Sequence, residues 1–104
     1  MRSVEELKDL NIKVAGFYGY EAQSNQLVEE CAELIQAVNK YRRARGLGQS
    51  TPVELMEAKD NLIEEIADVE VMLDQIKYLL KVHELDIQAV KDKKMSRTLE
   101  RMYK

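Results

Sequence analysis

The sequence predicts an all-α fold: one domain over residues 1–104, in which four helices form a bundle and two long central helices carry paired acidic residues. Three observations predict this class. The composition combines 34% charged residues with one proline, four glycines and no tryptophan, which favours helices over sheets. Apolar residues recur in steps of three and four along two long segments. Capping signals precede the expected helices, and the length suits a single modest core.

The N-terminal segment is expected to form a short helix followed by a turn. Ser3 and Glu6 have the spacing of a capping box, so a helix is predicted over residues 3–10. Beyond it, Gly16 and Gly19 lie among three aromatic residues. This combination predicts an ordered turn ahead of the next helix.

A long second helix is expected from about Glu21 to just before Gly46. Basic residues near its end suit a helix C-terminus, where positive charge is favourable. Its apolar stripe has steps of three and four and comprises Leu27, Cys31, Leu34, Val38 and Tyr41.

The stretch GLGQSTP, residues 46–52, is the clearest break in the chain. Thr51 and Glu54 have capping-box spacing, and Pro52 suits the first helical position, so a third helix is predicted to run to about Lys81. Its stripe comprises Leu62, Ile66, Val69, Leu73, Ile76 and Leu80. A turn at VHELD then precedes a last helix, for which Asp86 is the expected cap.

An acidic pattern occurs twice in the long helices. The letters LVEECAELIQAV in the second helix nearly repeat as LIEEIADVEVML in the third. Residues three apart lie on one helical face, which pairs Glu30 with Glu33 and Glu65 with Asp68 beside the apolar stripes. An acidic helix face is usually a solvated surface. Repetition of the same offset from the stripe favours instead a site shared by two helices.

Four carboxylates at one seam repel one another, so a cation is expected between them. Oxygen donors without histidine or cysteine suit Mg²⁺ or Mn²⁺. A di-iron bundle fits less well, because it requires Glu-x-x-His and the only histidine, His83, has Leu80 three residues before it.

The motif EExxE that begins at Glu29 and the motif ExxD that begins at Glu65 together resemble the signature of the MazG-like all-α nucleoside triphosphate pyrophosphohydrolases. The resemblance extends from about Tyr18 to Met102, although the interval between the motifs is longer than is usual in this family. It implies a MazG-like bundle and a Mg²⁺-dependent enzyme that converts a nucleoside triphosphate to a monophosphate and pyrophosphate, and so controls nucleotide pools. The catalytic and metal-binding residues it implies are Glu30, Glu33, Glu65 and Asp68.

Three further residues are candidates for substrate binding. Gln26 precedes Glu30 by four residues and shares its face. Lys94 and Arg97 are one helical turn apart on the last helix and are expected to bind phosphate groups, with ordinary surface charge as the alternative. Either Glu33 or Asp68 is expected to orient the attacking water.

The partners and location follow from the same data. A nucleoside triphosphate is the expected substrate, and the resemblance implies a homodimer or a dimer of dimers. The net charge of −3 disfavours nucleic acid as a partner, and the lack of a long apolar run disfavours a membrane. A cytoplasmic location is expected, because Cys31 has no second cysteine to pair with and the N-terminus does not resemble a signal peptide.

Two alternatives stay open. One is a non-catalytic helical interaction module whose acidic seam pairs with a basic partner, which predicts no dependence on divalent ions. The other is a phosphoribosyl-ATP pyrophosphatase, which shares the helical metal site.

Overall fold

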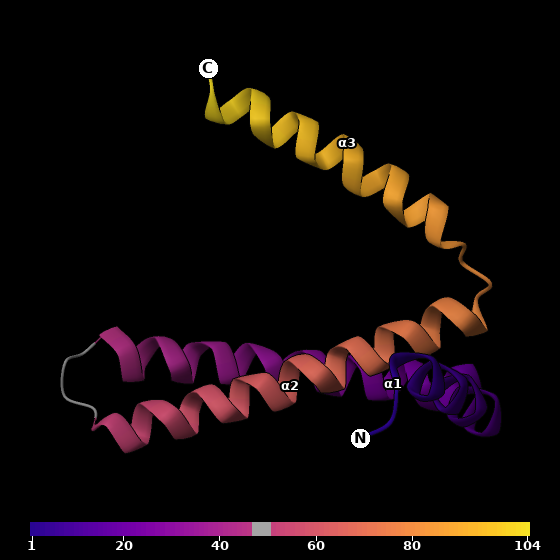
Figure 1. Cartoon of the computed structure of the whole chain (residues 1–104), viewed down its shortest axis with the longest axis horizontal. Coiled ribbons are helices and arrows are strands. Elements are labelled where there is room, and N and C mark those ends of the chain that lie inside the picture. The colour runs from indigo at the N-terminus through magenta and orange to yellow at the C-terminus, as the bar shows by residue number, and fades with distance from the viewer. Residues whose placement is uncertain (47–50) are drawn as a thin grey trace.

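The computed structural model describes residues 1–46 and 51–104, and over these residues the chain forms three helices and no strand. The helices are α1 (Val4–Gly46), α2 (Pro52–Leu79) and α3 (Glu84–Met102) (Figure 1). The predicted all-α class is therefore confirmed. The predicted helix count is not, because the first two expected helices form one kinked helix, α1.

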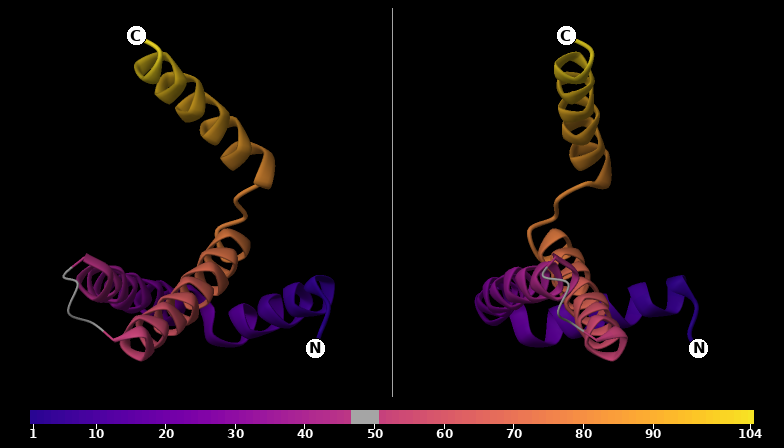
Figure 2. Two further views of the ribbon diagram at one scale, coloured as in Figure 1. Left: turned by 60° about the vertical axis from the view of Figure 1, so that its left-hand side comes forward. Right: turned by 90° about the vertical axis from the view of Figure 1, so that its left-hand side faces the viewer.

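The backbone of α1 leaves helical geometry at Gly19, where φ is 84° and ψ is 172°. This conformation is accessible essentially only to glycine. The kink divides α1 into an N-terminal arm, residues 4–18, and a long arm, residues 20–46, which run in different directions (Figure 2). The prediction of a turn after residue 10 was wrong, because residues 11–18 continue the helix. A single glycine such as Gly16 costs a helix only about 1 kcal/mol relative to alanine.

The predicted capping boxes are present at the starts of α1 and α2. The Glu6 N–H donates to Ser3 Oγ at 3.1 Å, and the Ser3 N–H donates to Glu6 Oε1 at 3.3 Å. Thr51 caps α2 in the same way, with Glu54 as its partner at 3.1 and 2.8 Å. Pro52 occupies the first turn, where a missing N–H leaves no bond unmade. Residues 47–50 of the expected break lie outside the described residues.

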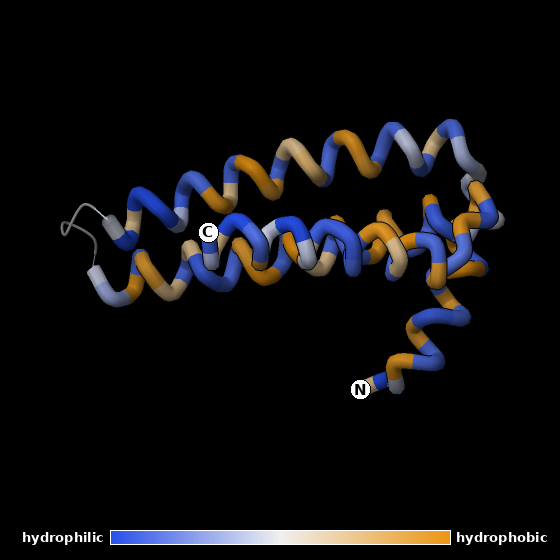
Figure 3. The backbone as a smooth tube through the Cα atoms, turned by 90° about the horizontal axis from the view of Figure 1, so that it is seen from above, coloured by the Kyte–Doolittle hydropathy of each residue, from blue (hydrophilic) through white to orange (hydrophobic). Residues whose placement is uncertain are grey.

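The long arm of α1 and helix α2 pack side by side (Figure 1). Their core is narrow and consists of small or flexible side chains, together with two glutamines. Its members are Ala37, Ala58, Val69, Met72, Gln23 and Gln75, and Ala15 on the N-terminal arm of α1 is buried as well. Several residues of the predicted apolar stripes stay largely exposed, among them Ile66 at 41% and Leu73 at 45%. In Figure 3 apolar residues recur along both helices, whereas the C-terminal part of α3 is mostly hydrophilic.

Helix α2 ends in a turn that directs α3 away from it. Lys81 adopts a left-handed conformation with φ of 56°. The Lys81 N–H donates to the Tyr78 carbonyl oxygen at 3.1 Å, and the Val82 N–H donates to that of Lys77 at 2.8 Å. These are the two bonds of a Schellman motif, in which glycine is the usual left-handed residue. The helix therefore ends at Leu79, slightly before the predicted end.

Helix α3 packs against neither α1 nor α2 over the described part of the chain, and none of its residues is buried (Figures 1 and 2). The bundle of four packed helices is therefore not formed within one chain. The N-cap is His83, whose Nδ1 accepts from the Leu85 N–H at 3.1 Å. Asp86, the predicted cap, lies in the first turn instead. No helix of residues 1–46 and 51–104 has the length and hydrophobicity needed to span a membrane.

Candidate metal centre

Four acidic side chains from α1 and α2 converge on one point, and we call them the carboxylate cluster: Glu30, Glu33, Glu65 and Asp68. One oxygen of each lies within 4.8 Å of one oxygen of every other member. The two residues from each helix are three positions apart and so share a face. Because the long arm of α1 packs along α2, the two faces meet at one place on the seam.

The cluster lies at the edge of the core. Glu30, Glu65 and Asp68 are half-buried, whereas Glu33 is exposed. Glu30 Oε2 and Glu65 Oε2 are both buried and lack a hydrogen-bond partner among the described residues. A buried carboxylate oxygen without a donor is costly, so these atoms need a proton or a cation.

The surroundings of the cluster disfavour ionisation of its carboxyl groups. Partial desolvation raises the pKa of Glu65 above its ordinary value, and the nearby Glu33, Asp68 and Glu30 raise it further. Partial desolvation also raises the pKa of Asp68, with a smaller contribution from Glu30. A divalent cation would offset both effects, and all-oxygen donors are those that Mg²⁺ and Mn²⁺ prefer.

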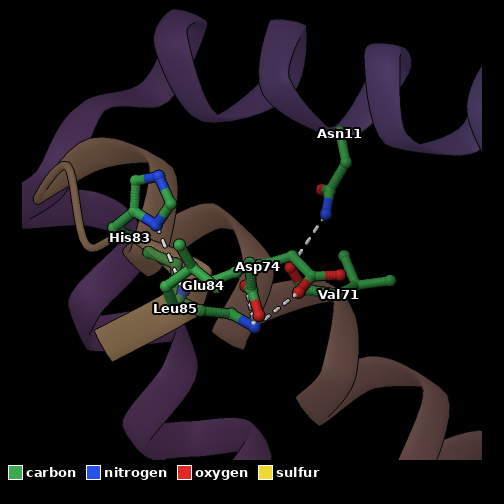
Figure 4. A network of polar contacts seen from close by, with 7 residues as sticks. Asn11, Val71, Asp74, His83, Glu84 and Leu85 are labelled. Carbon is green, nitrogen blue, oxygen red and sulfur yellow. Dashed lines mark hydrogen bonds and ion pairs between the residues drawn. The ribbon is translucent and has the colours of Figure 1, made fainter. Parts of the chain in front are cut away.

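Basic side chains in the described ranges do not neutralise the cluster. The ion pairs of the described residues lie elsewhere, close to the turn between α2 and α3. They join Lys77 to Asp74 at 3.2 Å and to Glu84 at 2.9 Å (Figure 4). The charge of the cluster must therefore be neutralised by protons, by a bound ion, by an ion that arrives with the substrate or by another chain.

Gln26 lies on the long arm of α1, one turn before the cluster. Its Nε2 donates to Glu30 Oε1 at 2.7 Å. This bond occupies Oε1 of Glu30 and leaves Oε2, which has no hydrogen-bond partner, for the point where the four carboxylates converge. In this structure Gln26 therefore orients a member of the cluster, and its predicted contact with substrate stays a prediction.

A chain of three amide side chains, two of them buried, lies farther along the same seam and was not identified by the sequence analysis. The Gln23 side chain donates to Gln75 Oε1 at 2.7 Å, and the Gln75 side chain donates to Asn11 Oδ1 at 2.7 Å. Asn11 in turn donates to the Val71 carbonyl oxygen at 3.0 Å (Figure 4). We call Asn11, Gln23 and Gln75 the amide network. It ties the N-terminal arm of α1 to α2 on the far side of the kink.

One signal in the sequence could have revealed this network. Gln23 lies seven residues before Glu30, and Gln75 lies seven residues after Asp68. Seven residues correspond to about two helical turns. Because the helices pack antiparallel, two glutamines at equal distances from facing carboxylates must also face each other.

Lys94 and Arg97 do not lie at the cluster of their own chain. Both are on α3, which points away from the α1–α2 pair (Figure 1). The predicted four-helix bundle would bring this helix beside the acidic residues, but α3 does not pack there within one chain. The left-handed turn at Lys81 sets the exit direction of α3, and the ion pair between Lys77 and Glu84 spans the turn.

These features define an all-helical protein in which two packed helices present paired acidic residues. The chain belongs to the MazG nucleotide pyrophosphohydrolase domain family, whose model matches residues 19–102. The match begins at the kink of α1 and includes the whole carboxylate cluster and α3. The family resemblance expected from the acidic motifs is thereby confirmed, and with it, at the level of the family, a hydrolase acting on phosphoric anhydrides. No curated protein and no solved structure matches the chain.

Proposed function

We propose that this chain is a Mg²⁺-dependent nucleoside triphosphate pyrophosphohydrolase, which converts a ribo- or deoxyribonucleoside triphosphate to its monophosphate and pyrophosphate. The observation that carries the proposal is the carboxylate cluster, with one oxygen from each of four side chains within 4.8 Å of the others. Its two buried oxygens without a partner support a cation-binding role over a solvated acidic surface.

The four residues of the cluster differ in burial, and we assign their roles on that basis. Glu30, Glu65 and Asp68 are half-buried and would hold Mg²⁺, with Mn²⁺ as the alternative. The bound ion would neutralise phosphate oxygens and make water easier to deprotonate. Glu33 is the exposed member, so it is best placed to orient water and accept its proton. Attack of that water on phosphorus breaks the bridge between the α- and β-phosphates and releases pyrophosphate.

Gln26 supports this arrangement from one turn away. Its bond to Glu30 at 2.7 Å restrains the carboxylate and selects which oxygen faces the metal. The second amide proton of Gln26 has no partner among the bonds of the described residues, so it is free to contact a nucleotide. This is the basis for keeping Gln26 as a substrate-binding candidate.

Association of copies is part of the proposal. Large apolar side chains remain uncovered on α1, with Phe17 80% and Ile35 62% exposed, and on α3 as well. Exposed surface of this kind marks a protein contact. A homodimer or a dimer of dimers would cover it and complete a four-helix MazG-like bundle from more than one chain. The proposed role is housekeeping of nucleotide pools in the cytoplasm, without nucleic acid or membrane as partner.

A substrate panel tests the proposal. Ribo- and deoxyribonucleoside triphosphates and phosphoribosyl-ATP are each incubated with protein and Mg²⁺, and both the monophosphate and pyrophosphate are quantified. The proposal expects the two products in equal amounts from at least one nucleoside triphosphate. Turnover of phosphoribosyl-ATP alone would favour the biosynthetic pyrophosphatase, and no turnover of any compound with either Mg²⁺ or Mn²⁺ would favour the interaction module.

A further inference from the structure

The amide network and the carboxylate cluster depend on the same alignment of α1 against α2. On α1, Gln23 lies seven residues before Glu30. On α2, Gln75 lies seven residues after Asp68. Partial desolvation raises the pKa of Asp68, and the acid that raises it further is Glu30, so these two carboxylates face each other. Because the helices are antiparallel, the bond between the two glutamines holds the alignment in which the carboxylates meet.

Apolar packing specifies this alignment only weakly. The buried apolar side chains between the two helices are Ala37, Ala58, Val69 and Met72, and within the described ranges no side chain larger than alanine is fully buried. Apolar contacts are non-directional, and a methionine adapts its shape to the space available. A buried amide is different, because it needs a partner at a fixed distance and is costly without one. The glutamines therefore penalise alignments that the apolar core would tolerate.

The carboxylates themselves oppose the observed alignment when no ion is bound. Repulsion between close acids grows as the local dielectric falls, and Glu30 and Glu65 each have a buried oxygen without a partner among the described residues. A slip of one helical turn would move α1 by about 5.4 Å, more than the 4.8 Å within which the cluster oxygens lie. Such a slip would relieve the repulsion, but it would also break the 2.7 Å bond between the glutamines.

Asn11 adds a second connection between α1 and α2. Its Oδ1 accepts from Gln75 at 2.7 Å, and its Nδ2 donates to the Val71 carbonyl oxygen at 3.0 Å (Figure 4). The N-terminal arm thus holds the Gln75 side chain toward Gln23 and contacts the backbone of α2 between the cluster and the network. Asn11 lies outside residues 19–102, so the arm adds this contact to the part of the chain that matches the family model.

We infer that Asn11, Gln23 and Gln75 are positioning residues, which hold α1 and α2 in the one alignment where four carboxylates can share a divalent cation. Seven residues of helix span about 10.5 Å, so the glutamines act through the helices and not as ligands. The network keeps the site assembled before the ion arrives, which favours ion binding. A role in turnover rests on the proposed function, whereas the alignment and the ion affinity do not.

Ion affinity and stability separate in a pair of variants, with Mn²⁺ alone as the probe. Gln75→Leu should lower Tm, whereas Gln23→Leu with Gln75→Leu should regain most of it, because no buried amide is left without a partner. Titration calorimetry is run at a temperature where circular dichroism shows both proteins folded. If the network only stabilised the fold, Mn²⁺ affinity would return with Tm. The positioning role predicts instead that Kd stays raised about tenfold in both, the lower limit for residues that support metal ligands.

Two single variants bracket this result. Asn11→Ala keeps the bond between the glutamines and should raise Kd for Mn²⁺ less than Gln75→Leu does. Ala37→Gly is the matched control, because Ala37 is buried on α1 seven residues after Glu30, as far from the cluster as Gln23 in the opposite direction. It weakens the helix without removing a side-chain hydrogen bond, so it should lower Tm and leave Kd within about twofold of wild type.

Electron paramagnetic resonance measures the alignment directly. Spin labels are attached at the exposed positions 40 and 70, one on each helix, in a Cys31→Ala background, and labelled chains are diluted with unlabelled ones. With intact glutamines the metal-free protein should give one narrow distance. The double leucine variant should give a broader or shifted distribution, and saturating Mg²⁺, which is diamagnetic, should narrow it.

The outcomes distinguish this inference from the proposed function. Wild-type Mn²⁺ affinity in the double leucine variant, or an unchanged distance distribution, would overturn the positioning role even in an active enzyme. A raised KM for nucleotide with unchanged Mn²⁺ affinity would also overturn it, since the amides would then contact substrate. Weakened Mn²⁺ binding and a broadened distribution in a protein whose wild type turns over no nucleotide would uphold the positioning role and refute the proposed function alone.

Discussion

The amide network should contribute measurably to stability, and Gln75→Leu tests this. Gln75 is only 3% exposed, accepts from Gln23 at 2.7 Å and donates to Asn11 at 2.7 Å. Leucine keeps most of the volume but removes both bonds. The Gln23 side chain, 8% exposed, then keeps a buried donor without an acceptor. Such a group costs about 1–3 kcal/mol, whereas the half-buried Asn11 can turn to water.

The expected loss is therefore about 1–3 kcal/mol in the free energy of unfolding. For a domain of this size each kilocalorie per mole lowers Tm by roughly 4–8 °C. Urea unfolding followed by far-ultraviolet circular dichroism measures the change, at one fixed protein concentration because association also adds stability. Gln36→Leu, at an exposed position of α1, is the matched control and should change the free energy of unfolding by less than about 0.5 kcal/mol.

A double-mutant cycle makes the test specific. Replacing both partners of a buried hydrogen bond by apolar groups of similar shape can be nearly neutral. Gln23→Leu with Gln75→Leu should therefore cost clearly less than the sum of the two single changes. Strict additivity, or a single Gln75→Leu change within about 0.5 kcal/mol of wild type, would refute this account of the network.

Three other predictions concern charge and backbone. Folding raises the pKa of Asp68 and Glu65 above their ordinary values of 3.8 and 4.5. Around these pH values the metal-free native state therefore binds more protons than the unfolded state. The native state loses stability as the pH rises and these protons dissociate. Its Tm should therefore fall as the pH rises above these two ordinary pKa values, and saturating Mg²⁺ or the Asp68→Asn change should reduce the fall. Gly19→Ala should lower the free energy of unfolding by about 1–3 kcal/mol, because only glycine tolerates the backbone conformation at the kink. The control is Gly16→Ala, in regular helix, where no atom lies within 4 Å of the added Cβ. It should raise the free energy of unfolding by up to about 1 kcal/mol, and melting followed by circular dichroism measures both changes. Lys81→Gly should raise the free energy of unfolding by up to about 1 kcal/mol, since it relieves a left-handed conformation that costs other residues about 1–2 kcal/mol; a loss of stability would contradict that reading.

Local signals predicted the starts of α1 and α2 and the facing acidic pairs. The caps at Ser3 and Thr51 depend on side chains within three residues of the backbone groups they bond, so the sequence alone defines them. The meeting of the four carboxylates follows from helical periodicity and from the repetition of one pattern in two helices that pack together.

Features that depend on tertiary context were missed. The segment around Gly16 has turn-forming composition, yet helix continues through it until Gly19, and no local rule decides which of two glycines breaks a helix. The sequence analysis assigned no role to Gln23 or Gln75, whereas the structure buries both glutamines and joins their side chains by a hydrogen bond. The direction of α3 depends on the left-handed turn at Lys81. The sequence does not predict this turn, because glycine rather than lysine is the usual residue in that conformation.

The most direct test of the central claim is the Mg²⁺ dependence of pyrophosphate release in two neighbouring variants. Glu65 belongs to the carboxylate cluster, whereas Glu64 beside it is exposed and outside the cluster. Initial rates are measured over a Mg²⁺ titration for wild type, Glu65→Gln and Glu64→Gln. The account predicts a saturable requirement for Mg²⁺ in wild type and Glu64→Gln, and a rate reduced at least about a hundredfold in Glu65→Gln, as expected when a metal centre loses a ligand. Turnover without divalent ions, or a Glu65→Gln protein as active as Glu64→Gln, would contradict it.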